Sequence, residues 1–438
     1  MPRIARLSRF SMLVSIALAT VLTACGDRGP DPLEMVSPPP SDACCPPTEV
    51  DWPRFRGVRG DGVVPGAGIE PWATAGPEEL WRRPLGPGFS SPSIQGDRLY
   101  VSANEGDEEL LLALEVETGE TLWQQPLGPA FQEEYGDGPR STPTVDDHGV
   151  VYALSSRAVL LAVDGGEGQV LWRHDLHRRF DARGYDRGYS SSPWVLGDLV
   201  ILNLGPGEGH AVVALNRRDG SVLWAAEDGV AAYGSPLAIE RDGETLVVSA
   251  IGSGLVALDP DDGSRLWHAP WPTRYGLNIA MPVVFDDGRV LLSSGYDQGA
   301  VMVRPTGEAV ETLWTQRLFR NHFSSSVAHG DLIFGFDNGT LQCLDATSGE
   351  SRWGDRGFGK GSLLRVGDTL VVLSERGELA LVDATDESFR PLARARVLEG
   401  KSWTAPVLAG SRLVLRGERE LLALRVDRRS EPDASAEI

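Results

Sequence analysis

The sequence has 438 residues, of which 41% are hydrophobic, so it can bury a sizeable core, and its 51 glycines and 30 prolines indicate many short strands rather than disorder. Its formal net charge of −21 at pH 7 disfavours binding to nucleic acid or to an anionic membrane surface. The length alone would suggest about two or three domains, although a repeat architecture can place all of it in one.

The first 24 residues carry the features of a bacterial signal peptide. Met12–Leu22 is an apolar run of eleven residues, too short to cross a bilayer as a helix, which needs about 20. It follows a positive stretch formed by Arg3, Arg6 and Arg9. It ends in Leu22-Thr23-Ala24-Cys25, which resembles the lipobox of bacterial lipoproteins. The resemblance implies that residues 1–24 are removed and that Cys25 becomes the lipidated N-terminus; the alternative is an ordinary secretory signal.

The expected location is the cell envelope. Gly26 follows the cysteine, whereas an aspartate in that place retains lipoproteins in the inner membrane of many Gram-negative bacteria. We therefore expect a lipid anchor in the outer membrane, with the protein facing the periplasm. Removal of residues 1–24 takes away three arginines and no acidic residue and changes the formal charge from −21 to −24. The predicted attachment thus depends on the lipid chains and not on a basic surface.

Two segments flank the body of the chain. Residues 25–50 are rich in proline and predict a semi-extended tether, and residues 430–438 predict a polar tail. Cys44 and Cys45 are adjacent within the tether and could pair with each other, pair between chains or stay free. Cys343 lies in an apolar strand pattern, which predicts a buried thiol. We expect no disulfide framework to hold the fold.

Between these segments a unit of about 45 residues recurs. Its second half is an apolar run, a glycine turn and a tryptophan, as in Leu112–Trp123. The tryptophans of this kind are Trp81, Trp123, Trp172, Trp224, Trp267, Trp314 and Trp353. The first half begins with a small residue and a proline, at Pro92, Pro143, Pro193, Pro236, Pro282 and Pro406, and degenerate copies at Ser326 and Ser362 complete eight units.

Each unit contains four short β patterns separated by Gly or Asp turns, and the body shows no helical period. The predicted fold class is all-β: an eight-bladed β-propeller of four-stranded antiparallel blades over residues 51–429. The last unit lacks its tryptophan strand, whereas Leu80-Trp81 is a tryptophan strand that precedes the first unit. We therefore expect this N-terminal strand to complete the eighth blade.

One form of the unit is specific enough to suggest a family. The pattern Ala-Leu-Asp-x-x-x-Gly-x-x-Leu-Trp at Ala257–Trp267 resembles the docking motif of pyrroloquinoline-quinone (PQQ) repeat propellers, in which the tryptophan packs against the adjacent blade. The lead-in Asp51–Gly57, with Gly60-Asp61-Gly62 after it, is similar to that of many secreted PQQ-like repeat proteins. The resemblance covers residues 51–427. It extends in length, lipobox and blade count to BamB, the lipid-anchored member of the outer-membrane β-barrel assembly machine.

This repeat serves enzymes and scaffolds alike. PQQ alcohol dehydrogenases hold the quinone over the propeller axis with calcium bound by carboxylate and amide side chains, and usually carry a disulfide between adjacent cysteines. Here the adjacent pair Cys44-Cys45 lies outside the repeats, and the sequence has no Cys-x-x-Cys-His haem motif. The acidic strings Asp259–Gly263 and Asp286–Gly288 fall at hairpin turns, and the seven histidines show no metal-ligand spacing. We expect no catalytic residue, no metal site and no cofactor; PQQ with calcium is implied only under the enzyme alternative.

The connections from each tryptophan strand to the next blade should emerge on one face, around the central channel. Aromatic, polar and basic side chains recur near the start of each blade. The predicted binding rim comprises Phe89, Arg140, Arg183, Tyr185, Arg187, Tyr189, Tyr233, Asn278, His322, Lys360, Lys401 and Trp403. In an acidic chain this composition favours an anionic or polar partner. The alternative is that these groups plug the channel mouth and pair with local acids.

The sequence therefore predicts a non-catalytic, lipid-anchored propeller that presents a binding face in the periplasm, with BamB-like assistance to outer-membrane protein assembly as its most specific form. The alternatives are a PQQ-dependent oxidoreductase and a module that binds polysaccharide or another small ligand. The expected partners are the membrane, through the N-terminal lipid, and a protein of the cell envelope. The charge argues against nucleic acid, and the oligomeric state stays open.

Overall fold

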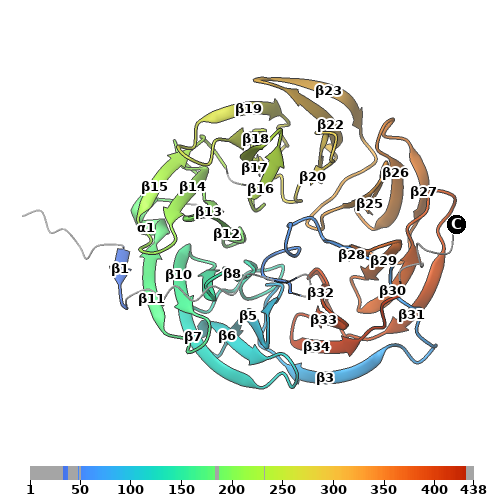
Figure 1. Cartoon of the computed structure of the whole chain (residues 1–438), viewed down its shortest axis with the longest axis horizontal. Coiled ribbons are helices and arrows are strands. Elements are labelled where there is room, and N and C mark those ends of the chain that lie inside the picture. The colour runs from blue at the N-terminus through green and yellow to red at the C-terminus, as the bar shows by residue number, and fades with distance from the viewer. Residues whose placement is uncertain (1–32, 38–47, 49–50, 183–186, 231, 431–438) are drawn as a thin grey trace, which may run out of the picture. The chain divides into compact units, whose positions relative to one another are not determined.

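Eight β-sheets follow one another around a central axis as the blades of a propeller (Figure 1). The computed structural model describes residues 33–37, 48, 51–182, 187–230 and 232–430. In these residues every blade has four antiparallel strands, and the one helix is α1, Leu176–Phe180. The predicted fold class is confirmed.

Each blade runs from an inner strand near the axis to an outer strand at the periphery. Blade 1 consists of β4 Ser93–Gln95, β5 Arg98–Glu105, β6 Glu108–Glu115 and β7 Thr121–Pro129, and blade 2 of β8 Thr144–Val145, β9 Val150–Leu154, β10 Val159–Asp164 and β11 Val170–Asp175. Blade 3 consists of β12 Trp194–Leu196, β13 Leu199–Asn203, β14 Val212–Asn216 and β15 Val222–Ala226, and blade 4 of β16 Leu237–Arg241, β17 Glu244–Ile251, β18 Gly254–Leu258 and β19 Arg265–Pro270.

Blades 5 to 8 continue the same order, and the last takes its outer strand from the N-terminal side of the chain. Blade 5 consists of β20 Val283–Val284, β21 Val290–Ser294, β22 Gly299–Thr306 and β23 Ala309–Gln316, and blade 6 of β24 Val327–His329, β25 Leu332–Asp337, β26 Thr340–Asp345 and β27 Ser351–Asp355. Blade 7 consists of β28 Ser362–Val366, β29 Thr369–Leu373, β30 Glu378–Asp383 and β31 Pro391–Arg396, and blade 8 of β32 Val407–Ala409, β33 Arg412–Arg416, β34 Glu420–Arg425 and β3 Glu78–Pro84.

The middle strands are buried on both faces because each blade is packed between two others. In β6, Leu111 and Ala113 pack against blade 2, whereas Leu110, Leu112 and Leu114 belong to the cluster shared with blade 8. Side chains alternate between the faces of a strand, so a strand between two hydrophobic layers reads as a continuous apolar run. This is why the repeat shows runs such as Leu110–Leu114 instead of apolar–polar alternation.

The tryptophans of the outer strands fasten neighbouring blades together. The Trp172 Nε1 donates a hydrogen bond to the carbonyl oxygen of Arg217 in blade 3, 3.0 Å away. Its ring also covers Gly220, where a Cβ would lie 2.8 Å from the indole. Matching bonds of 2.7–3.0 Å are donated by Trp81, Trp123, Trp224, Trp314 and Trp353 to carbonyls of the following blade. The docking role implied for these tryptophans matches this geometry.

Trp267 is the exception. Its side chain is buried, but its Nε1 has no hydrogen-bond acceptor among the described residues. The next blade is the reason. Strands β22 and β23 extend to a tight turn at Gly307, with Thr306 opposite Ala309, so the longer turn after the third strand that presents a carbonyl to the other tryptophans is not formed there.

The Ser-Pro motifs at the start of the blades form a second set of contacts near the axis. Ser141 Oγ donates to the Ser191 carbonyl at 2.8 Å, and Thr144 Oγ1 donates to the Pro193 carbonyl at 2.6 Å. The Thr142 N–H donates to Ser192 Oγ at 3.0 Å, and the next junction repeats this contact, with the Ser192 N–H donating to Ser235 Oγ at 2.8 Å. The motif therefore joins inner strands, as the tryptophan joins outer strands.

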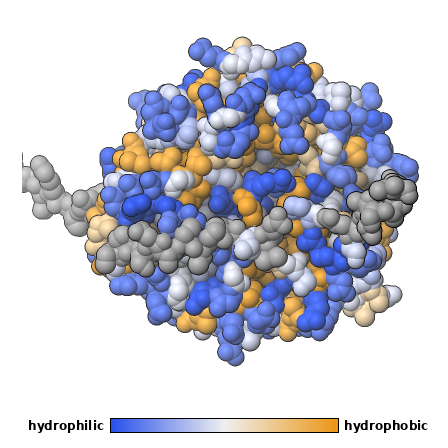
Figure 2. Space-filling view, viewed as in Figure 1, coloured by the Kyte–Doolittle hydropathy of each residue, from blue (hydrophilic) through white to orange (hydrophobic). Residues whose placement is uncertain are grey.

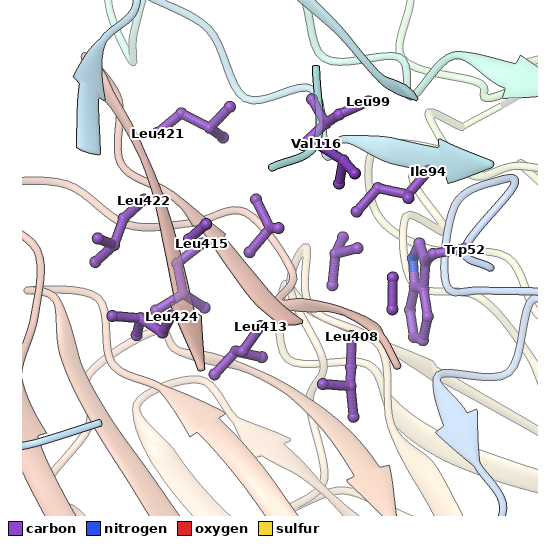
Figure 3. Packing of buried hydrophobic residues seen from close by; sticks show 14 of the residues in the cluster. Trp52, Ile94, Leu99, Val116, Leu408, Leu413, Leu415, Leu421, Leu422 and Leu424 are labelled. Atoms are coloured by element: carbon purple, nitrogen blue, oxygen red, sulfur yellow. The ribbon is translucent and has the colours of Figure 1, made fainter. Parts of the chain in front are cut away.

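The ring closes where the prediction placed the closure. Strand β3 pairs with β34 in antiparallel register, with Trp81 opposite Ala423. One hydrophobic cluster then continues from blade 8 into blade 1 and includes Leu421, Leu424 and Leu99 (Figure 3). Trp52, from the segment before β3, packs at one end of the same cluster.

The predicted tether over residues 25–50 needs a correction. Leu33–Met35 form strand β1, which pairs with β11 as a fifth strand on the outer edge of blade 2. The backbone N–H of Val36 also bonds to the Leu171 carbonyl at 2.8 Å. The chain is thus held against the propeller at these residues because the outer edge of β11 offers unpaired backbone groups. Cys25, Cys44 and Cys45 lie outside the described residues.

A second N-terminal strand, β2 Val63–Val64, pairs in parallel with β28 of blade 7. Seen along the direction of Figure 1, the surface is mostly hydrophilic, with hydrophobic residues in separate patches (Figure 2). Over the described part of the chain, we find no helix with the length and apolar content needed to span a bilayer.

Candidate functional site

A cavity of about 460 Å³ lies where the blade-to-blade connections meet around the axis. Every one of the eight connections between consecutive blades contributes to its lining. The lining residues are Phe55, Arg56, Phe89, Ser91, Glu133, Tyr135, Arg140, Arg187, Ser190, Ser192, Tyr233, Gly234, Ser235, Leu277, Ile279, Tyr296, His322, Phe323, Ser324, Ser325, Lys360, Ser362, Leu363, Trp403, Thr404 and Ala405. Its volume falls within the roughly 300–1,000 Å³ of small-ligand sites.

The floor of the cavity is made by the lead-in segment, residues 51–64. Trp52 pairs with Ile94 of blade 1, and the Pro53 carbonyl accepts a hydrogen bond from Val145 of blade 2 at 2.9 Å. On the opposite side, the Gly62 carbonyl accepts from Arg365 of blade 7 at 2.9 Å. The segment therefore crosses the channel, and it carries Phe55 and Arg56 into the cavity lining.

Arg56 is a buried cation at this floor. It is 4% exposed, and its guanidinium donates to three carbonyl oxygens, those of Asp61 (2.6 Å), Ser326 (2.6 Å) and Ser325 (3.3 Å). Its Nε has no partner among the described residues. Burial lowers the pKa of Arg56 to about 10, so the group is still charged at neutral pH. Its φ of +63° is unusual for a residue with a side chain. A charge held in a strained backbone without a carboxylate partner points to a functional role.

The wall and mouth add further positive charge. Arg140, Arg187 and Lys360 line the cavity, whereas the one acidic lining residue in the described part is Glu133, which forms an ion pair with Arg140. Lys401 lies beside them, with its Nζ 4.4 Å from the centre of the Trp403 ring and bonded to the Tyr135 carbonyl.

Both lysines were predicted at the rim, but their scarcity is a signal that the sequence analysis did not use. The whole chain has only two, Lys360 and Lys401, among 41 basic residues, and both lie at this mouth. Each lies over an aromatic ring: Lys360 Nζ is 5.9 Å from the centre of the Phe323 ring, and Lys401 Nζ is 5.8 Å from that of Phe89. Glu375 is the nearby acid, but it accepts hydrogen bonds from Trp403 Nε1 (3.0 Å) and from the Lys360 backbone N–H (3.3 Å).

Aromatic rings form a continuous arc around the mouth. Phe89 stacks on Trp403 with ring centres 5.5 Å apart, and Trp403 lies 4.9 Å from Phe323. The arc continues through His322 to Tyr296, at 5.3 Å and 5.1 Å. Such rings offer apolar faces for a ligand and attract cations to their own faces, which keeps the lysine and arginine groups near them.

The pKa of His322 reflects the charged groups around it. Burial, together with the positive charges of Lys360 and Arg187, lowers the pKa of His322 to about 4. The ring is therefore neutral at physiological pH, so the positive charge around it comes from lysine and arginine side chains.

The structure places seven of the predicted rim residues in the cavity lining: Phe89, Arg140, Arg187, Tyr233, His322, Lys360 and Trp403. Arg183 and Tyr185 lie outside the described residues. Tyr189 and Asn278 do not lie at the rim. The Tyr189 side chain is buried and its hydroxyl donates to the Ala182 carbonyl at 3.0 Å. The Asn278 amide is fully buried and donates to the Ile251 carbonyl at 2.7 Å. Both stabilise loops.

The groups near the axis do not resemble a calcium–quinone site. No cluster of three or more His, Cys, Asp or Glu side chains occurs among the described residues. The one acid in the lining, Glu133, is paired with Arg140, and the amide oxygens of the buried Asn203, Asn278 and Asn321 accept hydrogen bonds from the hydroxyls of Ser249, Ser294 and Ser326. These donors therefore do not fit the carboxylate and amide shell that a calcium ion needs.

The other candidate groups have structural partners. In the acidic turn Asp259–Gly263, Asp259 Oδ1 accepts from the Asp261 N–H at 2.8 Å, as expected for turn chemistry. Cys343 is buried, as predicted, and burial raises its thiol pKa to about 12.

The sequence pattern of a known family matches this chain. The family described as outer membrane protein assembly factor BamB matches residues 71–227 and 107–355, more than half of the sequence. Among curated proteins, the 1-butanol dehydrogenase (quinone) of Thauera butanivorans is 29% identical over 136 residues, which are 28% of this chain and 21% of the dehydrogenase. The outer membrane protein assembly factor BamB of Yersinia pestis is 24% identical over 288 residues, 60% of this chain and 68% of that protein. The chain thus spans about a fifth of the dehydrogenase's length.

Solved structures show the same fold at low sequence identity. BamB from Moraxella catarrhalis superposes with a TM-score of 0.58 at 14% identity, covering 79% of this chain and 99% of that one. A europium-containing methanol dehydrogenase gives a TM-score of 0.64 at 12% identity and covers 86% of this chain and 90% of the other. The repeat, the ring of eight blades and the match over most of the body agree, and the chain belongs to the BamB family of PQQ-type repeat propellers.

Proposed function

We propose that this protein is a non-catalytic scaffold of the cell envelope that binds a partner protein and assists outer-membrane protein assembly. The observation that carries the proposal is the family match over the body of the propeller, combined with a cavity built from binding groups. Cations and aromatic rings around a concave surface are the groups that proteins use at recognition sites.

The arrangement of the cavity supports binding over chemistry. A general base or nucleophile must have a free acceptor or an activated group. Glu133 is engaged by Arg140, and His322 has a pKa far below neutrality. The wall hydroxyls of Ser190 and Ser362 donate to backbone carbonyls at 2.7 Å and 2.9 Å.

The enzyme alternative has weaker support. The match to the quinone-dependent 1-butanol dehydrogenase covers 28% of this chain, and the donors near the axis do not fit a calcium–quinone site. We therefore propose that the chain has no bound cofactor. The purified protein should show no quinone absorbance after incubation with PQQ and calcium; stoichiometric retention of PQQ would favour the oxidoreductase.

For the location we propose the periplasmic side of the outer membrane, with the protein held by lipid chains on Cys25. The lipobox motif and the similarity to the Yersinia pestis assembly factor support this placement.

The proposal is tested in the bacterium that carries the gene. Deletion should lower the amount of β-barrel proteins in the outer membrane while inner-membrane proteins stay constant, as measured by quantitative proteomics. Crosslinking in cells, followed by purification of the tagged chain, should enrich the subunits of the barrel-assembly machine. Unchanged barrel levels together with no enrichment of those subunits would contradict the function.

A further inference from the structure

The channel mouth combines three features that select for one kind of ligand. Its cations outnumber its acids. Arg56, Arg187, Lys360 and Lys401 form no ion pair with a carboxylate in the described part of the chain, Arg140 and Glu133 neutralise one another, and Glu375 is the further carboxylate beside them. In a protein of net charge −21, this concentration of cations at one site indicates a binding role. Lysine and arginine at a half-buried site bind carboxylates more strongly than in open water, because the local dielectric is lower.

The second feature is the arc of rings from Phe89 through Trp403 to Tyr296. Lys360 lies over Phe323 and Lys401 over Phe89 and Trp403. Tyr135 lies under Arg187, whose guanidinium is 4.0 Å from the ring centre. A ligand that places an anion between the lysines therefore brings its neighbouring atoms onto aromatic faces. An apolar or aromatic group beside the anion would be buried there.

The third feature concerns the wall of the cavity. Ser192 Oγ accepts from the Thr142 N–H at 3.0 Å, Ser235 Oγ from the Ser192 N–H at 2.8 Å, and Ser325 Oγ from the Met281 N–H at 2.9 Å. These hydroxyls connect one blade to the next. A neutral sugar needs acceptors as well as donors from such groups for its many hydroxyls. Here a backbone N–H already occupies an acceptor site of each hydroxyl, whereas the O–H donors suit the oxygen atoms of an anion. The wall thus favours an anion with an apolar neighbour over a neutral polyol.

The floor adds a specific contact. Arg56 faces the cavity with its guanidinium fixed by three carbonyl oxygens, so it is already ordered before a ligand arrives. An ordered donor loses little conformational entropy on binding. The lysines at the mouth can therefore attract a carboxylate first, and Arg56 at the floor can then bind it.

We propose that the channel mouth receives an acidic side chain that is flanked by aromatic or aliphatic side chains in an extended segment of the partner protein. This inference rests on the proposed scaffold function, since it takes the ligand to be a protein. It specifies the chemistry of the segment: an Asp or Glu that Lys360 and Lys401 attract at the mouth and Arg56 binds at the floor, and an apolar neighbour on Phe89, Trp403 and Phe323.

The test uses the purified propeller and two capped peptides, acetyl-Gly-Phe-Asp-Phe-Gly-amide and its Asn counterpart. Isothermal titration should show at least tenfold tighter binding of the Asp peptide, with affinity that falls as salt rises from about 0.05 to 0.5 M. Phenylacetate is the third ligand and represents a free small acid. It should bind more weakly than the Asp peptide, because it lacks the second ring and the extended backbone.

The two lysines provide an independent readout. An amine-selective acetylating reagent can modify lysine side chains only at Lys360 and Lys401, and mass spectrometry then gives the extent at each. The Asp peptide should slow acetylation of both residues, and the Asn peptide should not. The double variant Lys360→Gln/Lys401→Gln should bind the Asp peptide no better than the Asn peptide. Arg218→Gln, at an exposed arginine in the turn after β14, is the control and should bind as the wild type does.

Equal binding of the two peptides would overturn the inference, as would phenylacetate binding as tightly as the Asp peptide, which would indicate a site for small acids. Arg56→Met adds a test of the floor: circular dichroism establishes folding, and a folded variant should lose at least tenfold in affinity. These outcomes are separate from those of the scaffold proposal. A propeller that ignores the peptides but still crosslinks to the barrel-assembly subunits would retain its function and use another surface.

Discussion

Trp172 in blade 2 donates a hydrogen bond from Nε1 to the carbonyl oxygen of Arg217 in blade 3, at 3.0 Å. The same carbonyl accepts from the Tyr152 hydroxyl at 3.2 Å. Two aromatic side chains of one blade therefore hold one backbone group of the next. Comparable bonds from five other tryptophans repeat this contact around the ring, and the stability of each blade becomes linked to that of its neighbour.

Truncation of these tryptophans should be costly where they are fully buried. Trp172 is 0% exposed, and Trp172→Ala should lower the free energy of unfolding by about 3–5 kcal/mol. Trp172→Phe keeps most of the ring but removes the N–H. We expect this variant to lower the free energy of unfolding by about 1 kcal/mol, since the Arg217 carbonyl retains its bond to Tyr152. Urea denaturation measures both. Trp123 is half-buried, so Trp123→Ala should lower the free energy of unfolding by less than Trp172→Ala does. Equal decreases in the two variants would contradict the dependence on burial.

The glycine that lies against Trp172, like those against Trp81, Trp123, Trp224 and Trp314, can be tested with a matched pair. Gly220 has a φ of +70°, and a Cβ there would lie 2.8 Å from the Trp172 ring. Gly149 has a φ of +77°, and in the described structure a Cβ at that position would meet no atom within 4 Å. Both alanine variants carry a backbone strain of about 1 kcal/mol, but only Gly220→Ala also displaces the indole. Gly220→Ala should therefore be the less stable of the two by thermal melting.

A third prediction concerns Glu109, which is 1% exposed and accepts a hydrogen bond from the Ser156 N–H at 2.9 Å. Burial raises the pKa of Glu109 from its ordinary 4.5 to about 7. As pH rises between these values, the unfolded chain loses this proton before the folded chain does, so the contribution of Glu109 to stability falls. Glu109→Gln cannot ionise and should be more stable than the wild type above about pH 7, by on the order of 3 kcal/mol.

The measurement is the difference in unfolding free energy between Glu109→Gln and the wild type from pH 4 to pH 8. Other carboxylates cancel in this difference. It should be near zero at pH 4, grow with pH and level off above pH 7. A difference that stays constant over this range would show that Glu109 ionises normally in the folded protein.

The potential at the channel mouth can be read from His322. Its pKa is lowered to about 4 by burial and by the charges of Lys360 and Arg187. In Lys360→Met one of those charges is gone, so the pKa of His322 should rise toward the ordinary value of 6.5. Nuclear magnetic resonance titration gives the value, and a His322→Gln variant identifies the signal. An unchanged pKa in Lys360→Met would mean that the lysine does not act on this ring.

The lipid anchor leads to a fifth prediction. Cys25→Ser should abolish incorporation of a labelled fatty acid and move the protein from the detergent phase to the aqueous phase. Cys44→Ser is the matched control, because it removes another cysteine of the N-terminal region outside the lipobox, and it should partition as the wild type does. A Cys25→Ser protein that still partitions into detergent would rule out this anchor.

The fold could be predicted because its markers are local in the sequence. Tryptophans such as Trp172 and Trp224 and prolines such as Pro143 mark the two ends of each unit, and the strand period is visible between them. Closure by Leu80-Trp81 followed from the strand missing in the last unit. The hydrogen-bond acceptors of the tryptophans, and the loss of one at Trp267, depend on turn geometry in the next blade.

The site was only partly predictable. Residues of the connections, such as Phe89 and Trp403, could be assigned to one face because the repeat fixes where each connection emerges. Loop residues have no period that gives the direction of a side chain, so Tyr189 and Asn278 could not be recognised as buried. Arg56 was missed since its contact with Ser325 spans 269 positions. The pairing of β1 with β11 was missed because three residues carry no strand signal of their own.

The closure of the ring also determines when folding can finish. Arg82 of β3 forms an ion pair with Glu420 of β34, which lies 338 positions later in the chain. During synthesis from the N-terminus, β3 must wait for nearly all of the remaining chain before it finds its partner. Until then its backbone groups form an unpaired edge that can join other strands. A chain cut short before Glu420 leaves this edge exposed permanently, so proteases can distinguish an incomplete copy from a finished one.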